Sequence, residues 1–214
     1  NKPMPKLIIH LSDIHIGSSP DRYDEYAQIF GKLSAELAAF IKNGHDCTIA
    51  ITGDTFHNKT RVTSKDIKCF TRLLSSLHNL PTVIILGNHD VNLNANNAED
   101  DLISPILEHS HFKNVILSKT TEVIALNGIN FVHASIAEKF DISRVESLLS
   151  SVEKPVLLYH GFAVGAMLNN SIIRKGDITR ELTAKTHLTL LGDIHERCLV
   201  ADNAGYAGSL IQQN

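Results

Sequence analysis

Five short apolar segments of this chain each end in side chains that can bind a metal, and this pattern most constrains the fold. The segments are 6–12, 47–52, 82–86, 155–159 and 188–191. They lead into Asp13-Ile14-His15, Gly53-Asp54, Gly87-Asn88-His89-Asp90, His160-Gly161 and Gly192-Asp193-Ile194-His195. In an open α/β sheet, ligands bind beyond the carboxyl ends of the strands. Such a sheet would gather these residues, and the adjoining glycines permit sharp turns and close backbone approach.

The segments between the first three strands have helical spacing. Apolar residues recur from Tyr26 to Ile41, and Asn43-Gly44 is typical of a helix end. A second pattern runs from Ile67 to Leu77, with Thr63 or Ser64 as its N-cap. A short helix is expected over 102–109. The first half of the chain is therefore predicted to be a βαβαβ unit with a parallel sheet.

The second half has a mixed pattern. Strands are predicted over 115–117, 121–126 and 129–133, with Asn127-Gly128 as a hairpin turn, and a helix over 143–152. The chain closes with a hairpin formed by 197–201 and 205–207. We expect two facing sheets with helices outside them, in a single domain that covers residues 1–214.

Composition narrows the class of protein. The chain has 20 basic and 23 acidic residues, a net charge of −3, which argues against a generic nucleic-acid coat. Three scattered cysteines form no disulfide framework, and no apolar run is long enough to span a membrane. With no leader peptide visible, we expect an intracellular location, in the cytoplasm or nucleus. Histidine is abundant, with 12 residues in 214.

The residues at the strand ends favour metal chemistry. A lone Asp after a strand is usually a turn or cap residue, but five such sites in one chain indicate a cluster. Adjacent carboxylates need a cation, and carboxylate, imidazole and amide oxygen together suit Mn²⁺, Fe²⁺ or Zn²⁺. The set exceeds the needs of one ion. Two ions that share a carboxylate are a known solution for phosphate-ester hydrolysis.

The order of these motifs resembles the calcineurin-like metallophosphoesterases, over positions 13 to 195. The resemblance implies a two-sheet αββα sandwich. A finer likeness lies in Gly53-Asp54-Thr55-Phe56-His57, followed by Arg61, and in Tyr206-Ala207-Gly208-Ser209-Leu210. Both segments resemble the SbcD-type nucleases, the nuclease subunits of DNA double-strand-break repair complexes.

The resemblance implies two divalent ions. One would be held by Asp13, His15, Asp54 and His195, and the other by Asp54, Asn88, His160 and Asp193. His89 would face the scissile phosphate, Asp90 would orient His89, and His57 would contact the phosphodiester. The family usually has His where this chain has Asp193. We expect Asp193 to favour Mn²⁺ above all, or Mg²⁺, over softer ions, and to have a shorter reach to the second ion than His.

The implied function is a DNA phosphodiesterase with 3′→5′ exonuclease and single-strand endonuclease activity, in double-strand-break repair or recombination. It would act with a coiled-coil ATPase of the SbcC type and as a homodimer, with no membrane partner. In these nucleases a DNA-capping domain and a partner-binding segment follow this region, so we expect a catalytic core. Two alternatives stay open: the same chemistry on a nucleotide, cyclic nucleotide or phosphoprotein, and a non-catalytic scaffold with a degraded metal site.

Further basic residues are candidates for holding substrate. Lys59, Arg61 and Lys65 form a small basic group after the second strand, and Arg174 lies in the polar loop after His160. Each fits a DNA backbone contact and equally a solvated surface. His10 and His133 are expected to be structural.

Overall fold

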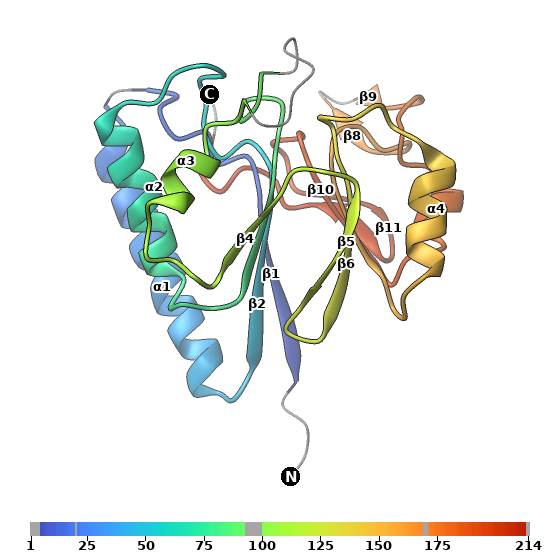
Figure 1. Cartoon of the computed structure of the whole chain (residues 1–214), viewed down its shortest axis with the longest axis horizontal. Coiled ribbons are helices and arrows are strands. Elements are labelled where there is room, and N and C mark those ends of the chain that lie inside the picture. Colours follow the sequence, from blue (N-terminus) through green and yellow to red (C-terminus); the bar gives the residue numbers. More distant parts are fainter. Residues whose placement is uncertain (1–4, 20, 93–99, 169–170, 213–214) are drawn as a thin grey trace.

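Four parallel strands form the first sheet of the computed structural model, which describes residues 5–19, 21–92, 100–168 and 171–212 (Figure 1). The strands are β1 (Lys6–Leu11), β2 (Asp46–Thr52), β3 (Thr82–Ile85) and β4 (Val115–Ser118), in that spatial order. All neighbouring pairs are parallel. The crossovers carry α1 (Tyr23–Lys42), α2 (Ser64–Ser76) and α3 (Ser104–Glu108).

The second sheet has six strands in the order β11-β12-β10-β7-β6-β5. They are β5 (Glu122–Leu126), β6 (Ile129–Ala134), β7 (Val156–His160), β10 (Leu188–Gly192), β11 (Cys198–Ala201) and β12 (Ala204–Tyr206). The inner four pair in parallel, and β5 and β11 join antiparallel at the edges. The remaining elements are α4 (Ile142–Ser150), α5 (Arg180–Thr183) and a hairpin of β8 (Met167–Leu168) and β9 (Ser171–Ile172).

Three apolar layers hold these sheets together. One lies between the first sheet and α1 and α2, and includes Phe30 and Phe70. A second lies between the second sheet and α4 and α5. The third lies between the two sheets, where Ile85 of β3 and Phe131 of β6 belong to one buried cluster. The helices thus cover the outer faces (Figure 1), which confirms the predicted αββα sandwich.

Local sequence signals explain several boundaries. The Thr63 side chain caps α2 and exchanges hydrogen bonds with Asp66 in a capping box, as one of the two predicted caps. Asn127 and Gly128 both have positive φ, 51° and 70°, as a type I′ hairpin turn requires. No helix in the described part of the chain combines the length and the apolar character needed to cross a bilayer.

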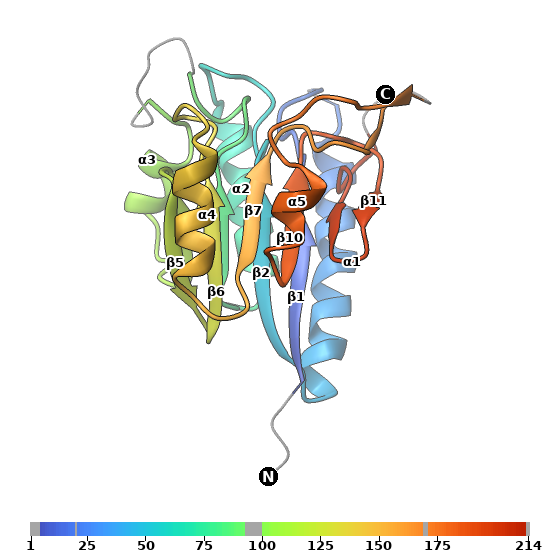
Figure 2. The ribbon, with the colours of Figure 1, turned by 90° about the vertical axis from the view of Figure 1, so that its right-hand side faces the viewer.

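The structure departs from the sequence pattern in a few places. The segment at 115–117 was expected to join the mixed second half, but β4 pairs with β3 and completes the first sheet. The β8–β9 hairpin and α5 were not expected, because elements of two to four residues are too short to show a period. The carboxyl ends of β1, β2, β7 and β10 point the same way (Figure 2), as predicted.

Candidate metal centre

The exit of β1 places Asp13 and His15 in an unusual backbone conformation. Both residues have positive φ, 50° and 52°. The loop is held by backbone hydrogen bonds from Asp13 N to Gly53 O (3.1 Å) and from His15 N to Asp54 O (2.9 Å). From α1, the buried Tyr26 hydroxyl lies 2.8 Å from Ile14 O and 2.7 Å from His15 O, and donates to these carbonyls. The loop with the first two predicted metal ligands is therefore held by contacts to the end of β2 and to α1.

Left-handed backbone is concentrated at this edge of the sheets. Of the eight non-glycine residues with positive φ in the described ranges, four are predicted ligands: Asp13, His15, Asp54 and Asp193. Each such residue costs of the order of 1–2 kcal/mol, so strain of this kind persists where the surroundings enforce it and is common at functional sites. The clustering indicates that side-chain placement dominates the local structure here.

His160 is aimed by a backbone carbonyl at the end of β2. Its Nδ1 lies 2.8 Å from Thr52 O, so Nδ1 carries the proton and donates it. This fixes the tautomer and leaves the lone pair of Nε2 directed at the other site residues. Gly53 makes the approach possible, because a Cβ at that position would overlap the His160 ring.

Asp90 has a different role from the one expected. Its buried carboxylate accepts hydrogen bonds from the backbone N–H groups of Thr55 (3.2 Å), Phe56 (2.9 Å) and Gly87 (2.9 Å). The prediction that Asp90 orients the His89 ring is wrong, because both carboxylate oxygens are engaged by the backbone. The Nδ1 of His89 donates instead to the carbonyl of His57. Asp90 joins the loops after β2 and β3.

The loop after β10 completes the centre from the other end of the chain. The backbone N–H of Asp193 lies 3.2 and 3.1 Å from the two carboxylate oxygens of Asp13. A C-terminal segment ties this loop to the β1 exit, since Ser209 N donates to His195 O (3.0 Å) and Leu210 N to Ser12 O (3.3 Å). His195 is the most open member, with its side chain 44% exposed.

One group of ligand atoms surrounds His15 Nε2. That atom lies 3.1 Å from His195 Nε2, 3.6 Å from Asp54 Oδ2 and 3.9 Å from Asp13 Oδ1. His195 Nε2 lies 3.8 Å from the same Asp13 oxygen. Asp13, His15 and His195 thus converge with Asp54, as the set expected for the first ion.

A second group surrounds His160 Nε2. It lies 3.0 Å from Asn88 Oδ1, 3.5 Å from Asp54 Oδ1 and 3.7 Å from Asp193 Oδ1. Asp54 contributes one oxygen to each group, so it lies between them. The Asp193 side chain is close enough to take part, at 28% exposure.

The donor set fits divalent metal ions. Two ligand atoms that are each about 2.1 Å from one ion lie about 3.0–3.4 Å apart when adjacent and about 4.2 Å when opposite. The separations in both groups fall inside this range. Three-residue subsets of His, Asp and Glu with ligand atoms within 4.8 Å of one another include Asp13-His15-His195 and Asp13-Asp54-His160. Carboxylate oxygens and neutral imidazoles suit Mn²⁺, Fe²⁺ and Zn²⁺, and exclude a thiolate site.

The charges of the clustered side chains favour a cation at the centre. Burial lowers the pKa of His160, but the carboxylates of Asp54, Asp13 and Asp193 outweigh it and raise that pKa to about 10. Burial raises the pKa of Asp13 and of Asp193, with His160 opposing the shift. Burial lowers the pKa of His15 to about 3, against the pull of Asp54, so this ring is neutral and free to bind a metal. A bound cation would replace the proton on His160.

His57 and His89 form the wall of the cleft beside the ligands. Their rings stack with centroids 5.3 Å apart, and both rings lie about 5 Å from the His15 ring, with centroids 5.4 and 5.0 Å from it. Phe56, fully buried against Phe70, anchors the loop that carries the His57 carbonyl. With Nδ1 of His89 donating to that carbonyl, its Nε2 is available to a substrate. The cleft has a volume of about 720 Å³ and is lined by both rings and by His15, Asp54 and His195.

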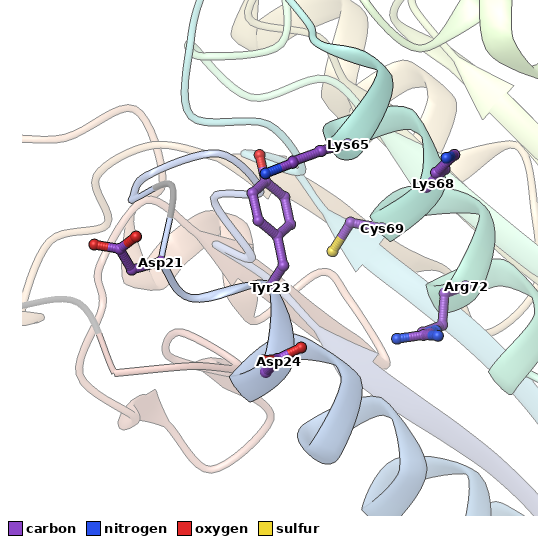
Figure 3. Close-up of a pocket in the computed structure, with 7 residues that line it drawn as sticks. All are labelled: Asp21, Tyr23, Asp24, Lys65, Lys68, Cys69 and Arg72. Atoms are coloured by element: carbon purple, nitrogen blue, oxygen red, sulfur yellow. The ribbon is translucent and has the colours of Figure 1, made fainter.

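The predicted substrate-binding cations are less well placed. Lys59, Arg61 and Arg174 are exposed, and none of them lines this cleft. Lys65 lies over the Tyr23 ring and faces a separate cavity of about 710 Å³. In Figure 3 it projects from α2 with Lys68 and Arg72, while Asp21 and Asp24 lie at the start of α1.

Some residues that support the centre were not identified from the sequence. Tyr26 was assigned to the core by its helical spacing, which says nothing about its hydroxyl. The bond from His160 to the Thr52 carbonyl could not be predicted, because a side-chain motif says nothing about backbone atoms. Arg22 lines the cleft and donates to Gln212 O (2.8 Å). The only sequence feature that could have indicated its place at the site was its position seven residues after His15. His10 and His133 lie outside both ligand groups, as expected: His10 bonds Thr52 Oγ1 and His133 bonds Ser118 Oγ, each at 2.8 Å.

Comparison with known proteins agrees with the site. The family model described as calcineurin-like phosphoesterase (Metallophos) matches residues 6–197, a range that contains every predicted ligand. The chain is 31% identical over 227 residues, with 98% of it covered, to the uncharacterized protein R555 of Acanthamoeba polyphaga mimivirus. It spans 16% of that protein's length.

Proposed function

The chain belongs to the calcineurin-like phosphoesterase family, and from its metal centre we propose that it is a two-metal phosphodiesterase that cleaves DNA. Members of this family use divalent metals to hydrolyse phosphoesters. The observation that carries the two-metal proposal is Asp54, whose two oxygens lie 3.6 Å from His15 Nε2 and 3.5 Å from His160 Nε2. A carboxylate shared in this way suits ions roughly 3.5–4 Å apart.

The proposed ligands divide into two sets. Asp13, His15 and His195 would hold one ion, Asn88, His160 and Asp193 would hold the other, and Asp54 would contribute to both. Bound divalent ions supply a water molecule activated at neutral pH and neutralise charge on the phosphoryl oxygens. The protein holds the ligands rigid through Tyr26, Thr52 and the C-terminal segment.

His89 is the proposed acid. Its Nδ1 donates to the His57 carbonyl, so its Nε2 faces the cleft and is a donor when the ring is an imidazolium. In that position it protonates the leaving oxygen or stabilises charge on the phosphate. The stacked His57 ring provides a second contact for the phosphodiester.

DNA is proposed as substrate because of the segment Gly53-Asp54-Thr55-Phe56-His57, which resembles the SbcD-type nucleases. The buried Phe56 places the His57 carbonyl on His89, so this segment contributes to the catalytic geometry as well as to the likeness. From the carboxylate of Asp193 we propose Mn²⁺ as the metal. By the same likeness we propose 3′→5′ exonuclease and single-strand endonuclease activity, and a homodimer that acts with an SbcC-type ATPase in break repair.

The test measures cleavage of end-labelled single- and double-stranded DNA beside bis-p-nitrophenyl phosphate, with Mn²⁺, Mg²⁺ or EDTA. Cleavage of both DNA and the small ester, lost in EDTA and in His89→Ala, is the expected result. The control is His109→Ala, because His109 is exposed and does not line the cleft. Cleavage of the small ester alone would move the substrate to nucleotides or phosphoproteins. Inactivity on both with no bound metal would indicate a scaffold.

A further inference from the structure

A second pocket adjoins the metal centre on the side of the β8–β9 hairpin. Its volume is about 380 Å³. Its walls are Met167 and Leu168 of β8, the loop Asp193–Glu196, and Gln212. Asp193 and His195 also line the catalytic cleft, so the two spaces share a wall. A substrate held at the ions would therefore have its neighbouring group beside this pocket.

The apolar wall of this pocket is open to solvent. Met167 is 41% exposed and Leu168 is 36% exposed, although both are large apolar side chains. Elsewhere most residues of this type in the described part are packed into the three cores. An exposed apolar surface at the rim of an active site is typical of a ligand contact.

Charge identifies the kind of ligand. The pocket is lined by the carboxylates of Asp193 and Glu196 and by no lysine or arginine of the described residues. Asp193 is a proposed metal ligand, so Glu196 is the carboxylate that would repel an anion in this pocket. A neutral, flat group with polar edges would be accepted, because its faces can contact Met167 and Leu168 while its edges reach Glu196 and Gln212.

We propose that this pocket binds the nucleobase next to the scissile phosphate. The proposal rests on the proposed function, since it takes the phosphate to lie at the ions. Met and Leu side chains are inserted between base steps in some DNA complexes, and contacts to the face of a base tolerate any sequence. The pocket thus assigns to the enzyme an unpaired or unstacked nucleotide as its preferred substrate, with little discrimination among the four bases.

The test compares thymidine 5′-monophosphate with 2-deoxyribose 5-phosphate, which share their sugar and phosphate and differ by the base. Binding is measured by titration calorimetry on the Mn²⁺-loaded protein. We expect the nucleotide to bind about five- to tenfold more tightly, the lower end of base-stacking contributions because the wall is aliphatic. The double variant Met167→Ser, Leu168→Ser should bring this ratio close to one. Leu199→Ser, at an apolar residue 78% exposed outside the pocket, should keep it.

The outcomes separate this proposal from the one it rests on. Equal affinity for the two ligands in the wild-type protein would overturn the base pocket and leave the phosphodiesterase standing. A preference that survives the double variant would also overturn it, because the base would then lie elsewhere. Failure of both ligands to bind, with Mn²⁺ present, would remove the phosphate site and both proposals together. Thermal unfolding of each variant checks that the fold is intact.

Discussion

Replacing Tyr26 by Phe tests whether the helix α1 holds the metal-binding loop in its strained form. The Tyr26 side chain is fully buried, and its hydroxyl reaches Ile14 O and His15 O. His15 O also accepts from Ser18 N (3.0 Å), so it keeps a partner after the substitution. Ile14 O, on a residue with no exposed surface, loses the hydroxyl.

The magnitude follows from that lost partner. A buried carbonyl left without its donor costs about 1–3 kcal/mol in the free energy of unfolding. For a chain of this size, each kcal/mol lowers Tm by about 2–4 °C. If the loop then leaves its left-handed conformation, metal binding must restore it. The same 1–3 kcal/mol corresponds to an upper limit of about 5- to 150-fold weaker binding of the ion at His15.

The assay combines thermal unfolding in EDTA with Mn²⁺ titration calorimetry. Tyr23→Phe is the matched control, because Tyr23 lies on the same helix but donates to Asp66 Oδ1 (2.6 Å) of α2. We expect both variants to be less stable and only Tyr26→Phe to bind Mn²⁺ more weakly. Unchanged stability and unchanged affinity in Tyr26→Phe would refute the idea that this hydroxyl maintains the loop.

Three further predictions concern the centre itself. Asp54→Asn should reduce the bound metal from two ions towards none, measured by elemental analysis; retention of two ions would contradict the shared ligand. His89→Ala should keep both ions and lower kcat for DNA by about 10²–10⁴-fold, the usual contribution of a positioned acid; full activity would refute its role. Because Asp54 and its neighbours raise the pKa of His160 to about 10 against an unfolded value of 6.5, the protonated ring stabilises the metal-free fold below about pH 6.5, and this contribution disappears as the pH rises through 10. Mn²⁺ must displace that proton, so the affinity of the protein for Mn²⁺ should rise by up to about tenfold per pH unit between pH 7 and 9. Calorimetry should also detect the released proton through its uptake by the buffer. An Mn²⁺ affinity that does not change with pH would show that His160 is neutral before binding.

The sequence predicted which residues meet, and the structure shows how they are held. Parallel strands end at one edge of a sheet, so polar residues at strand ends can be expected to meet. The convergence of Asp13, Asp54, Asn88, His160 and His195 was therefore predicted without coordinates. The groups that hold these side chains in place are mostly backbone atoms, such as the carbonyl of Thr52. Every residue has a backbone carbonyl, so the residue type does not indicate which carbonyl takes this role. Side-chain identity therefore predicts the ligands better than it predicts the shell around them.

Asp90 illustrates the same limit. Adjacent to His89 in sequence, it was expected to contact that ring, but neighbouring residues in a tight turn project in different directions. The turn sends the Asp90 carboxylate into the protein, where three backbone N–H groups meet it. The ring of His89 takes its support from His57, 32 residues away in sequence. Short elements such as β8 could likewise not be predicted, because two residues are too few to show a periodic pattern of apolar side chains.

The contact between His15 and His195 has a consequence for how the protein is made. The two residues are 180 positions apart, so the centre joins nearly the first and nearly the last segment of the described chain. During translation, the ligands from β1, β2 and β3 leave the ribosome long before the loop after β10 does. The emerging chain therefore cannot form a complete centre until its synthesis passes that loop, and truncated products should be inert. Any activity of the centre is thus delayed by the order of its ligands along the sequence.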